Sequence, residues 1–175
     1  IENLPQEYKD ETDFETVFVD LDIKPLPALT AWLTGESYHV KRFINQQMKN
    51  KLAEILKKEE FDIVQMESIF LTPYVPLVRK LSKAKVVLRS PNVENMIWKR
   101  TYKATKNPLK RYYLKHLALT LEYYEKENIN QYDAIFPVTD VDANYFIENG
   151  YRKLCKAIAV GIETPEFIPD VLEEE

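Results

Sequence analysis

The sequence has little of the residue types that most often build small catalytic or metal sites. Among 175 residues there are one cysteine, two histidines and three glycines. The single Cys155 excludes an intramolecular disulfide and gives no cysteine-based metal spacing. His39 and His116 are too far apart to form a zinc motif, and no Gly-rich phosphate-binding loop is present. We therefore expect neither a metal nor a bound cofactor.

The sequence also lacks an apolar run near the ~20 residues that a membrane helix needs, and we expect no signal peptide. Its net charge of −4 gives the molecule no general attraction for nucleic acid. The shares of hydrophobic (45%) and charged (30%) residues are typical of one globular domain. These features predict a cytoplasmic protein.

One stretch organises the rest, from Lys85 to Arg100. Val86 to Leu88 are the apolar run of a buried strand, the Ser90–Asn92 turn ends it, and a helix opens at Glu94. In a parallel sheet, ligands bind beyond the carboxyl ends of the strands. This stretch therefore predicts a functional edge at Arg89 to Glu94.

Strands and helices are predicted to alternate along the chain, which favours parallel pairing through right-handed crossovers. We expect a three-layer, doubly wound, mainly parallel α/β sheet with four strand ends converging. The predicted strands are Phe14–Leu21, Asp62–Met66, Lys85–Ser90, Ala134–Val138 and Lys156–Val160. The predicted helices are Leu26–Leu33, Tyr38–Lys58 (with Ser37 as its cap), Thr72–Leu81, Val93–Thr105, Pro108–Asn130 (capped by Asn107) and Asp140–Asn149 (stopped by Gly150).

Several segments resemble the amino-terminal domain of family-four glycosyltransferases, which are retaining enzymes of the GT-B fold. The family commonly shows a "His-Asn-Val-Glu" turn, a helix with "Ile-Trp-Glu-Arg", and an interdomain "Asn-Gly-Val-Asp" with a following Phe. The resemblance covers about 38–169. The matching residues are Asn92, Val93, Glu94, Ile97, Trp98 and Arg100, then Gly161, Ile162, Glu163 and Phe167.

Three departures accompany the resemblance. The family histidine of the turn is Pro91 here, and the "Pro-Asn" of the hinge is Ala159-Val160. The chain begins at Ile1 and has no counterpart of the family's first strand and Gly-rich loop. We expect one Rossmann-like domain over 1–160, truncated at both ends, with 161–175 as a linker to an absent second domain.

The resemblance implies an acceptor-side half that is inactive alone. The parent enzyme would move a sugar from a nucleotide-sugar, its co-substrate, to a glycan or lipid-linked acceptor in polysaccharide biosynthesis. The absent carboxyl-terminal domain would hold the donor. Two alternatives stay open: a GT-B-type sugar-nucleotide epimerase, which would need cleft carboxylates and a histidine, and a non-catalytic interaction domain.

The candidate substrate-binding residues lie at the predicted strand ends, and no catalytic residue is assigned. Asn92 and Glu94 could line the cleft or only cap and charge a helix amino end. Arg89 could meet a phosphate or an acidic acceptor, or pair with Glu67. The full set is Arg89, Asn92, Glu94, Glu67, Thr139 and Asp140.

Two Asp-x-Asp pairs occur, Asp20 with Asp22 and Asp140 with Asp142. Such a pair holds a metal on the sugar nucleotide in another glycosyltransferase fold. Oxygen sites usually need more convergent ligands. A turn and a helix start explain these two pairs better than a metal does.

No acidic residue stands between Glu94 and Glu122, so this stretch of two helices is basic on an acidic protein. It could face an anionic membrane or a lipid-phosphate acceptor, or be a solvated helical hairpin. No nucleic-acid-binding module is recognisable. The membrane interpretation predicts peripheral contact at the inner membrane face through Lys99, Arg100, Lys103, Lys106, Lys110 and Arg111.

Overall fold

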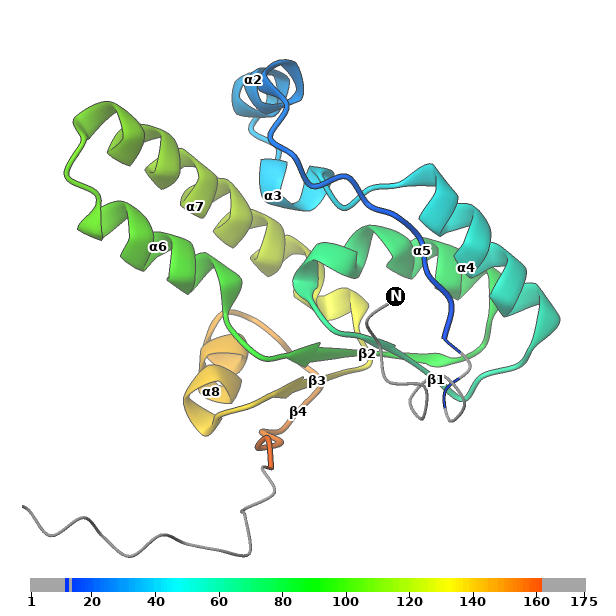
Figure 1. Ribbon diagram of the computed structural model, residues 1–175. Coiled ribbons are helices and arrows are strands. Elements are labelled where there is room, and N and C mark those ends of the chain that lie inside the picture. The colour runs from blue at the N-terminus through cyan, green and yellow to red at the C-terminus, as the bar shows by residue number, and fades with distance from the viewer. Residues whose placement is uncertain (1–11, 13, 162–175) are drawn as a thin grey trace, which may run out of the picture.

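The chain folds around one parallel sheet, as a computed structural model that describes residue 12 and residues 14–161 shows (Figure 1). Its strands are β1 (Ile63–Met66), β2 (Lys85–Ser90), β3 (Ala134–Pro137) and β4 (Leu154–Cys155). All three neighbouring pairs are parallel, in the order β1-β2-β3-β4. The α/β class with a parallel sheet is confirmed. Within the described residues the strand order follows the chain without the reversal that a doubly wound sheet contains.

The helices connect the strands and extend beyond them. Helices α6 and α7 form a long hairpin that, together with α2, projects away from the sheet (Figure 1). The helical elements are α2 (Pro25–Thr34), α3 (Tyr38–Lys41), α4 (Gln46–Lys58), η1 (Ile69–Tyr74), α5 (Val75–Leu81), α6 (Glu94–Ala104), α7 (Pro108–Asn128), η2 (Ile129–Gln131) and α8 (Asp140–Glu148).

Helix ends follow the predicted local chemistry in several places. The Asn107 side chain accepts a hydrogen bond from the Lys110 backbone N–H, and Pro108 takes the first helical position of α7. Gly150 follows α8 with φ +102°, which an L side chain rarely adopts. These short-range signals therefore fix the bounds of the crossovers that lead into and out of the sheet.

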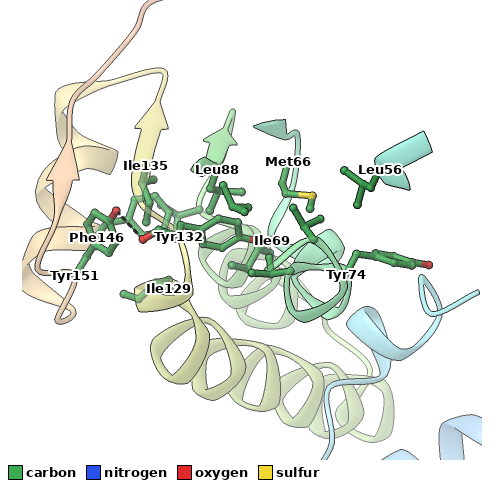
Figure 2. Close-up of a cluster of buried hydrophobic side chains, with 14 residues drawn as sticks. Leu56, Met66, Ile69, Tyr74, Leu88, Ile129, Tyr132, Ile135, Phe146 and Tyr151 are labelled. Atoms are coloured by element: carbon green, nitrogen blue, oxygen red, sulfur yellow. Dashed lines mark hydrogen bonds between the residues drawn. The ribbon is translucent and has the colours of Figure 1, made fainter. Parts of the chain in front are cut away.

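The main core lies on one face of the sheet. Val86, Leu88 and Ile135 are fully buried, and register pairing puts Leu88 beside Ile135. Side chains from α5, η2 and α8, among them Val78, join the same cluster. Figure 2 shows the strand residues of this cluster in a row between Phe146 and Tyr74. The crossover helices therefore bury one continuous apolar layer against the sheet.

The predicted first strand, Phe14–Leu21, is wrong. This segment is extended but pairs with no strand in the described part of the chain. It lies along α3 and α4, where the Asn45 amide donates to the Phe18 carbonyl (3.0 Å) and Lys51 pairs with Glu15. The Phe18 side chain is 80% exposed. The alternation of its residues therefore does not correspond to a buried sheet face.

The predicted helix Tyr38–Lys58 is broken into α3 and α4. Asn45 leaves the helical conformation and its side chain accepts from the Gln47 and Met48 backbone N–H groups, so it caps a new helix. Ser37 precedes α3 but makes no side-chain cap bond. The predicted Thr72–Leu81 helix likewise starts as the 3-10 turn η1 and becomes α-helical only at Val75.

The last strand is shorter and earlier than predicted. The assigned strand is β4, Leu154–Cys155, and not Lys156–Val160. Two backbone bonds continue along β3, from Lys156 N–H to the Ile135 carbonyl and from Ile158 N–H to the Pro137 carbonyl. Gly161 therefore stands six positions beyond a strand end. The predictions for 1–11 and 162–175, including most of the linker, lie outside the described residues.

Candidate site at the carboxyl edge of the sheet

An ion pair joins the carboxyl ends of β1 and β2. Arg89 Nη1 lies 2.9 Å from Glu67 Oε2, and both side chains are partly exposed. Gln65 also donates to Glu67 (2.5 Å). The Arg89 guanidinium, the largest cause, holds the pKa of the Glu67 carboxyl below its usual range. This outcome agrees with the pairing alternative, and it leaves both groups at the edge where a ligand can reach them.

A hydrogen bond from a buried serine stabilises the turn after β2. Ser90 is buried, and its hydroxyl donates to the Asn92 carbonyl (2.7 Å), which closes the turn around Pro91. The Asn92 side chain is exposed beyond the strand end. Of the two alternatives for Asn92, capping of the next helix is ruled out, because Val93 is the N-cap of α6 and its side chain makes no cap bond. The Asn92 side chain therefore lies exposed at the edge of the sheet and does not cap α6.

Glu94 opens α6 as its first helical residue, as predicted, and is partly buried. Burial raises the pKa of its carboxyl above the ordinary value. A carboxyl that is partly withdrawn from water and partly protonated can both donate and accept hydrogen bonds. The position therefore keeps both predicted roles available, at the helix amino end and toward the edge.

The polar residues after β3 act as a helix cap. Thr139 is the N-cap of α8: its hydroxyl accepts from the Asp142 backbone N–H (3.1 Å) and donates to the Asp142 carboxylate (2.7 Å). Asp140 is exposed in the first helical turn, where the helix dipole favours an acid. The capping explanation of the second Asp-x-Asp pair therefore accounts for Thr139 and Asp142.

The other Asp-x-Asp pair lines a separate pocket. Asp20 pairs with Lys24 (2.7 Å) and accepts from the Asp22 backbone N–H. These residues, with Tyr38 and Arg42, border a pocket of about 280 Å³ between the extended segment and α3. None of the predicted edge residues borders it. Among the described residues, no group of three or more histidine, cysteine or acidic side chains could hold a metal ion.

A buried polar network beneath the edge was not predicted. Asn95, in the first turn of α6, is fully buried and Glu125 of α7 is 3% exposed. Glu125 accepts from the Asn95 backbone N–H (3.1 Å) and from the Asn95 amide, which also donates to the Tyr145 hydroxyl (2.8 Å). Glu125 therefore supplies the cap that α6 lacks locally and links α6, α7 and α8.

Burial dominates the electrostatics of this network. Desolvation raises the pKa of Glu125 to about 7, although both bonds from Asn95 oppose the shift. Burial also raises the pKa of Tyr145. One signal for Glu125 exists in the sequence, since it continues the apolar stripe of α7 four positions after Leu121. An acid in a buried stripe needs donors from elsewhere, and the sequence does not show which residue supplies them.

Charged and amide groups lie at adjacent strand ends, and the buried Asn95–Glu125 network holds the helices beside them in place. Register pairing aligns the ends of β2 and β3, so Thr139 follows the strand beside Arg89. The described edge residues offer hydrogen-bonding groups of both signs, which can bind and orient a polar ligand. Comparisons with family models, with curated proteins and with solved structures find no match to the chain.

Proposed function

We propose that the chain is the acceptor-side domain of a glycosyltransferase that moves a sugar from a nucleotide-sugar to a glycan or lipid-linked acceptor. The observation that carries the proposal is the convergence of polar side chains at the carboxyl edge of a parallel sheet. The Asn92–Glu94 turn, which carries the family resemblance, stands at that edge. Edges of this kind bind ligands in open α/β sheets.

In this proposal the domain acts by positioning. Asn92 and the Arg89–Glu67 pair hold acceptor hydroxyls. Glu94, the first residue of α6, fixes the turn that carries Asn92. The described sheet is then part of a larger, doubly wound three-layer sheet, and a second domain of the same protein binds the donor phosphates across the cleft. The rate gain from this half comes from holding the reacting hydroxyl close to the donor sugar.

The test uses the complete polypeptide that contains this chain, incubated with a panel of nucleotide-sugars, and measures release of nucleoside diphosphate. Asn92→Ala combined with Glu94→Ala is expected to lower turnover by about a hundredfold, the scale of a misplaced substrate. Asn50→Ala with Glu54→Ala on α4 is the matched control, because both residues are exposed and remote from the edge. Both variants should keep the far-ultraviolet circular dichroism of the parent.

No turnover of any nucleotide-sugar by the parent protein would refute the enzymatic proposal. Equal turnover in parent and Asn92/Glu94 variant would refute the site while leaving the activity. The two results separate the class of protein from the residues that serve it.

A further inference from the structure

An apolar stripe on α2 faces away from the rest of the molecule. Ala28 and Ala31 pack toward Leu114 and Leu117 of α7. Leu26, Leu29 and Leu33 recur at helical spacing on the opposite side, and Leu26 and Leu33 are 75% and 70% exposed. Figure 1 shows α2 standing at the outside of the molecule, next to the α6–α7 hairpin. Three leucines in one stripe are more than the scattered exposed apolar residues of an ordinary surface.

Helix α7 has an exposed apolar and aromatic stripe of its own. Leu109, Tyr112, Leu119 and Tyr123 lie on one face at spacings of three, seven and four residues, and Leu109 at the hairpin tip is 82% exposed. Trp32 of α2 meets His116 of α7 with ring centroids 6.0 Å apart. His116 lies on the same face as Leu109, so the α2 contact borders this stripe.

The hairpin tip is basic, and its cations form no ion pair within the described part of the chain. Lys103, Lys106, Lys110 and Arg111 are exposed, and they take part in none of the ion pairs within residues 14–161. Lys99, which the sequence interpretation grouped with them, differs because it pairs with Glu122 (2.8 Å). The acids of α7 stand in its carboxyl-terminal half, so positive charge is concentrated toward the tip.

We propose that this end of the molecule, the leucine stripe of α2 with the basic α6–α7 tip, docks on an anionic lipid surface. Leucines and a tip leucine enter the headgroup boundary, tyrosines lie at the interface, and lysines pair with lipid phosphates. No helix among the described residues is long and apolar enough to cross a membrane. The contact is therefore peripheral and lies in the plane of the interface.

Charge complementarity favours an anionic lipid surface over a second copy of the chain at this end of the molecule. A second copy of the chain would bring the same four cations against each other, and like charges across an interface are costly. A bilayer with anionic lipids supplies negative charge next to an apolar layer, which matches lysines beside leucines. Helix α6 runs from Glu94 to this tip over 11 residues, about 16 Å at 1.5 Å per residue. Docking would hold the sheet edge near the lipid headgroups.

The test measures sedimentation of the 175-residue chain with phosphatidylcholine vesicles, with and without phosphatidylglycerol. Binding is expected only with phosphatidylglycerol, and it should weaken at about 0.5 M salt because exposed charges are then screened. Lys103→Glu with Lys106→Glu and Lys110→Glu should lower binding at least about a hundredfold, at roughly fivefold per residue. Leu26→Ser with Leu29→Ser and Leu33→Ser should also abolish it.

The matched control reverses three exposed lysines elsewhere, Lys57, Lys80 and Lys83, with the same change in net charge. This control should lose much less binding than the hairpin variant. Equal loss in both, or binding to pure phosphatidylcholine as strong as to the mixture, overturns the proposal. A solution dimer that the leucine variant cannot form, without vesicle binding, also overturns it and assigns the face to a second copy. The assay contains no sugar donor, so its result is independent of the proposed transferase activity.

Discussion

Two ionisable side chains are buried against α6, one with polar partners and the other among rings. Glu125 is 3% exposed and receives both the Asn95 backbone N–H and the Asn95 amide. His39 of α3 is 6% exposed and its ring lies 4.0 Å from the Trp98 ring, centroid to centroid. Within the described residues, His39 Nε2 has no hydrogen-bond partner. The same helix therefore contacts a satisfied buried acid and an unsatisfied buried base.

The comparison shows that burial shifts both groups toward their neutral forms, whereas only one of them organises structure. Desolvation, with the nearby Arg42 charge, lowers the pKa of His39 to about 4. Desolvation raises the pKa of Glu125 to about 7. Removal of His39 takes away packing alone, but removal of Glu125 leaves donors of another helix without an acceptor. Breaking such a pair on one side costs more than replacing both partners.

The largest expected effect follows from Glu125→Ala. The change leaves the Asn95 backbone N–H and amide buried without an acceptor and opens a cavity, so the free energy of unfolding should fall by about 3 kcal/mol. Urea denaturation followed by circular dichroism measures this as a lower midpoint at an unchanged slope.

Glu127→Ala is the matched control, since Glu127 is two positions away on α7 and exposed. It should change the free energy of unfolding by less than about 0.5 kcal/mol, as is usual for surface substitutions. Similar losses in both variants would mean that the network does not hold α6 in place.

The second prediction concerns pH and uses both groups. The folded pKa of His39 lies below its unfolded value near 6.5, so the unfolded state binds a proton first as pH falls. The protein is therefore destabilised as pH falls from 6.5 toward about 4, and His39 has no such effect above pH 6.5. The folded pKa of Glu125 lies above its unfolded value near 4.5, so its stabilising contribution is present below that pH and is lost as pH rises through about 7. Each contribution is on the order of 3 kcal/mol, and the two oppose each other across nearly the same range.

Single variants should separate the two contributions. With His39→Leu the protein should gain stability relative to the parent as pH falls from 6.5 to 4, because the group that resists protonation is gone. With Glu125→Gln the relative stability should instead rise with pH between 4.5 and 7. Urea titrations at steps of pH give both difference curves. A flat curve for either variant would show that the folded and unfolded pKa values of that residue are alike.

The strands show what the sequence can and cannot predict. The predicted bounds of β2, Lys85 and Ser90, are confirmed. A short continuous apolar run between turn residues is typical of a buried strand, so the local sequence is enough to predict it. Phe14–Leu21 has an equally suggestive alternation, but it pairs with no strand among the residues that the structure describes. Pairing depends on residues far away in sequence, and an isolated pattern does not contain that information. The break at Asn45 depends on a cap that competes with a continuous helix.

At the candidate edge, too, some contacts can be predicted from the sequence and others cannot. The contact between Glu67 and Arg89 could be expected, since parallel strands bring their carboxyl ends to one side. The Asn95–Glu125 network could not, because 30 positions separate the two residues and neither belongs to a motif. Local patterns predict which groups reach the surface of the edge, and tertiary packing decides what holds that edge from below.

The smallest expected effect, Tyr145→Phe, tests how far the Glu125 network extends. The Tyr145 hydroxyl accepts from the Asn95 amide at 2.8 Å and is the contact of α8 with the network. Phenylalanine keeps the ring and its packing on Phe146, and it removes one neutral hydrogen bond, so the free energy of unfolding should fall by about 1 kcal/mol. Tyr123→Phe, at an exposed tyrosine of α7, should have no measurable effect. Combined with Glu125→Ala, the loss from Tyr145→Phe should differ from its value alone by more than about 0.5 kcal/mol, since the two residues share Asn95. Simple additivity of the two changes would instead show that α8 is held independently, and that the partnered side of α6 joins two helices rather than three.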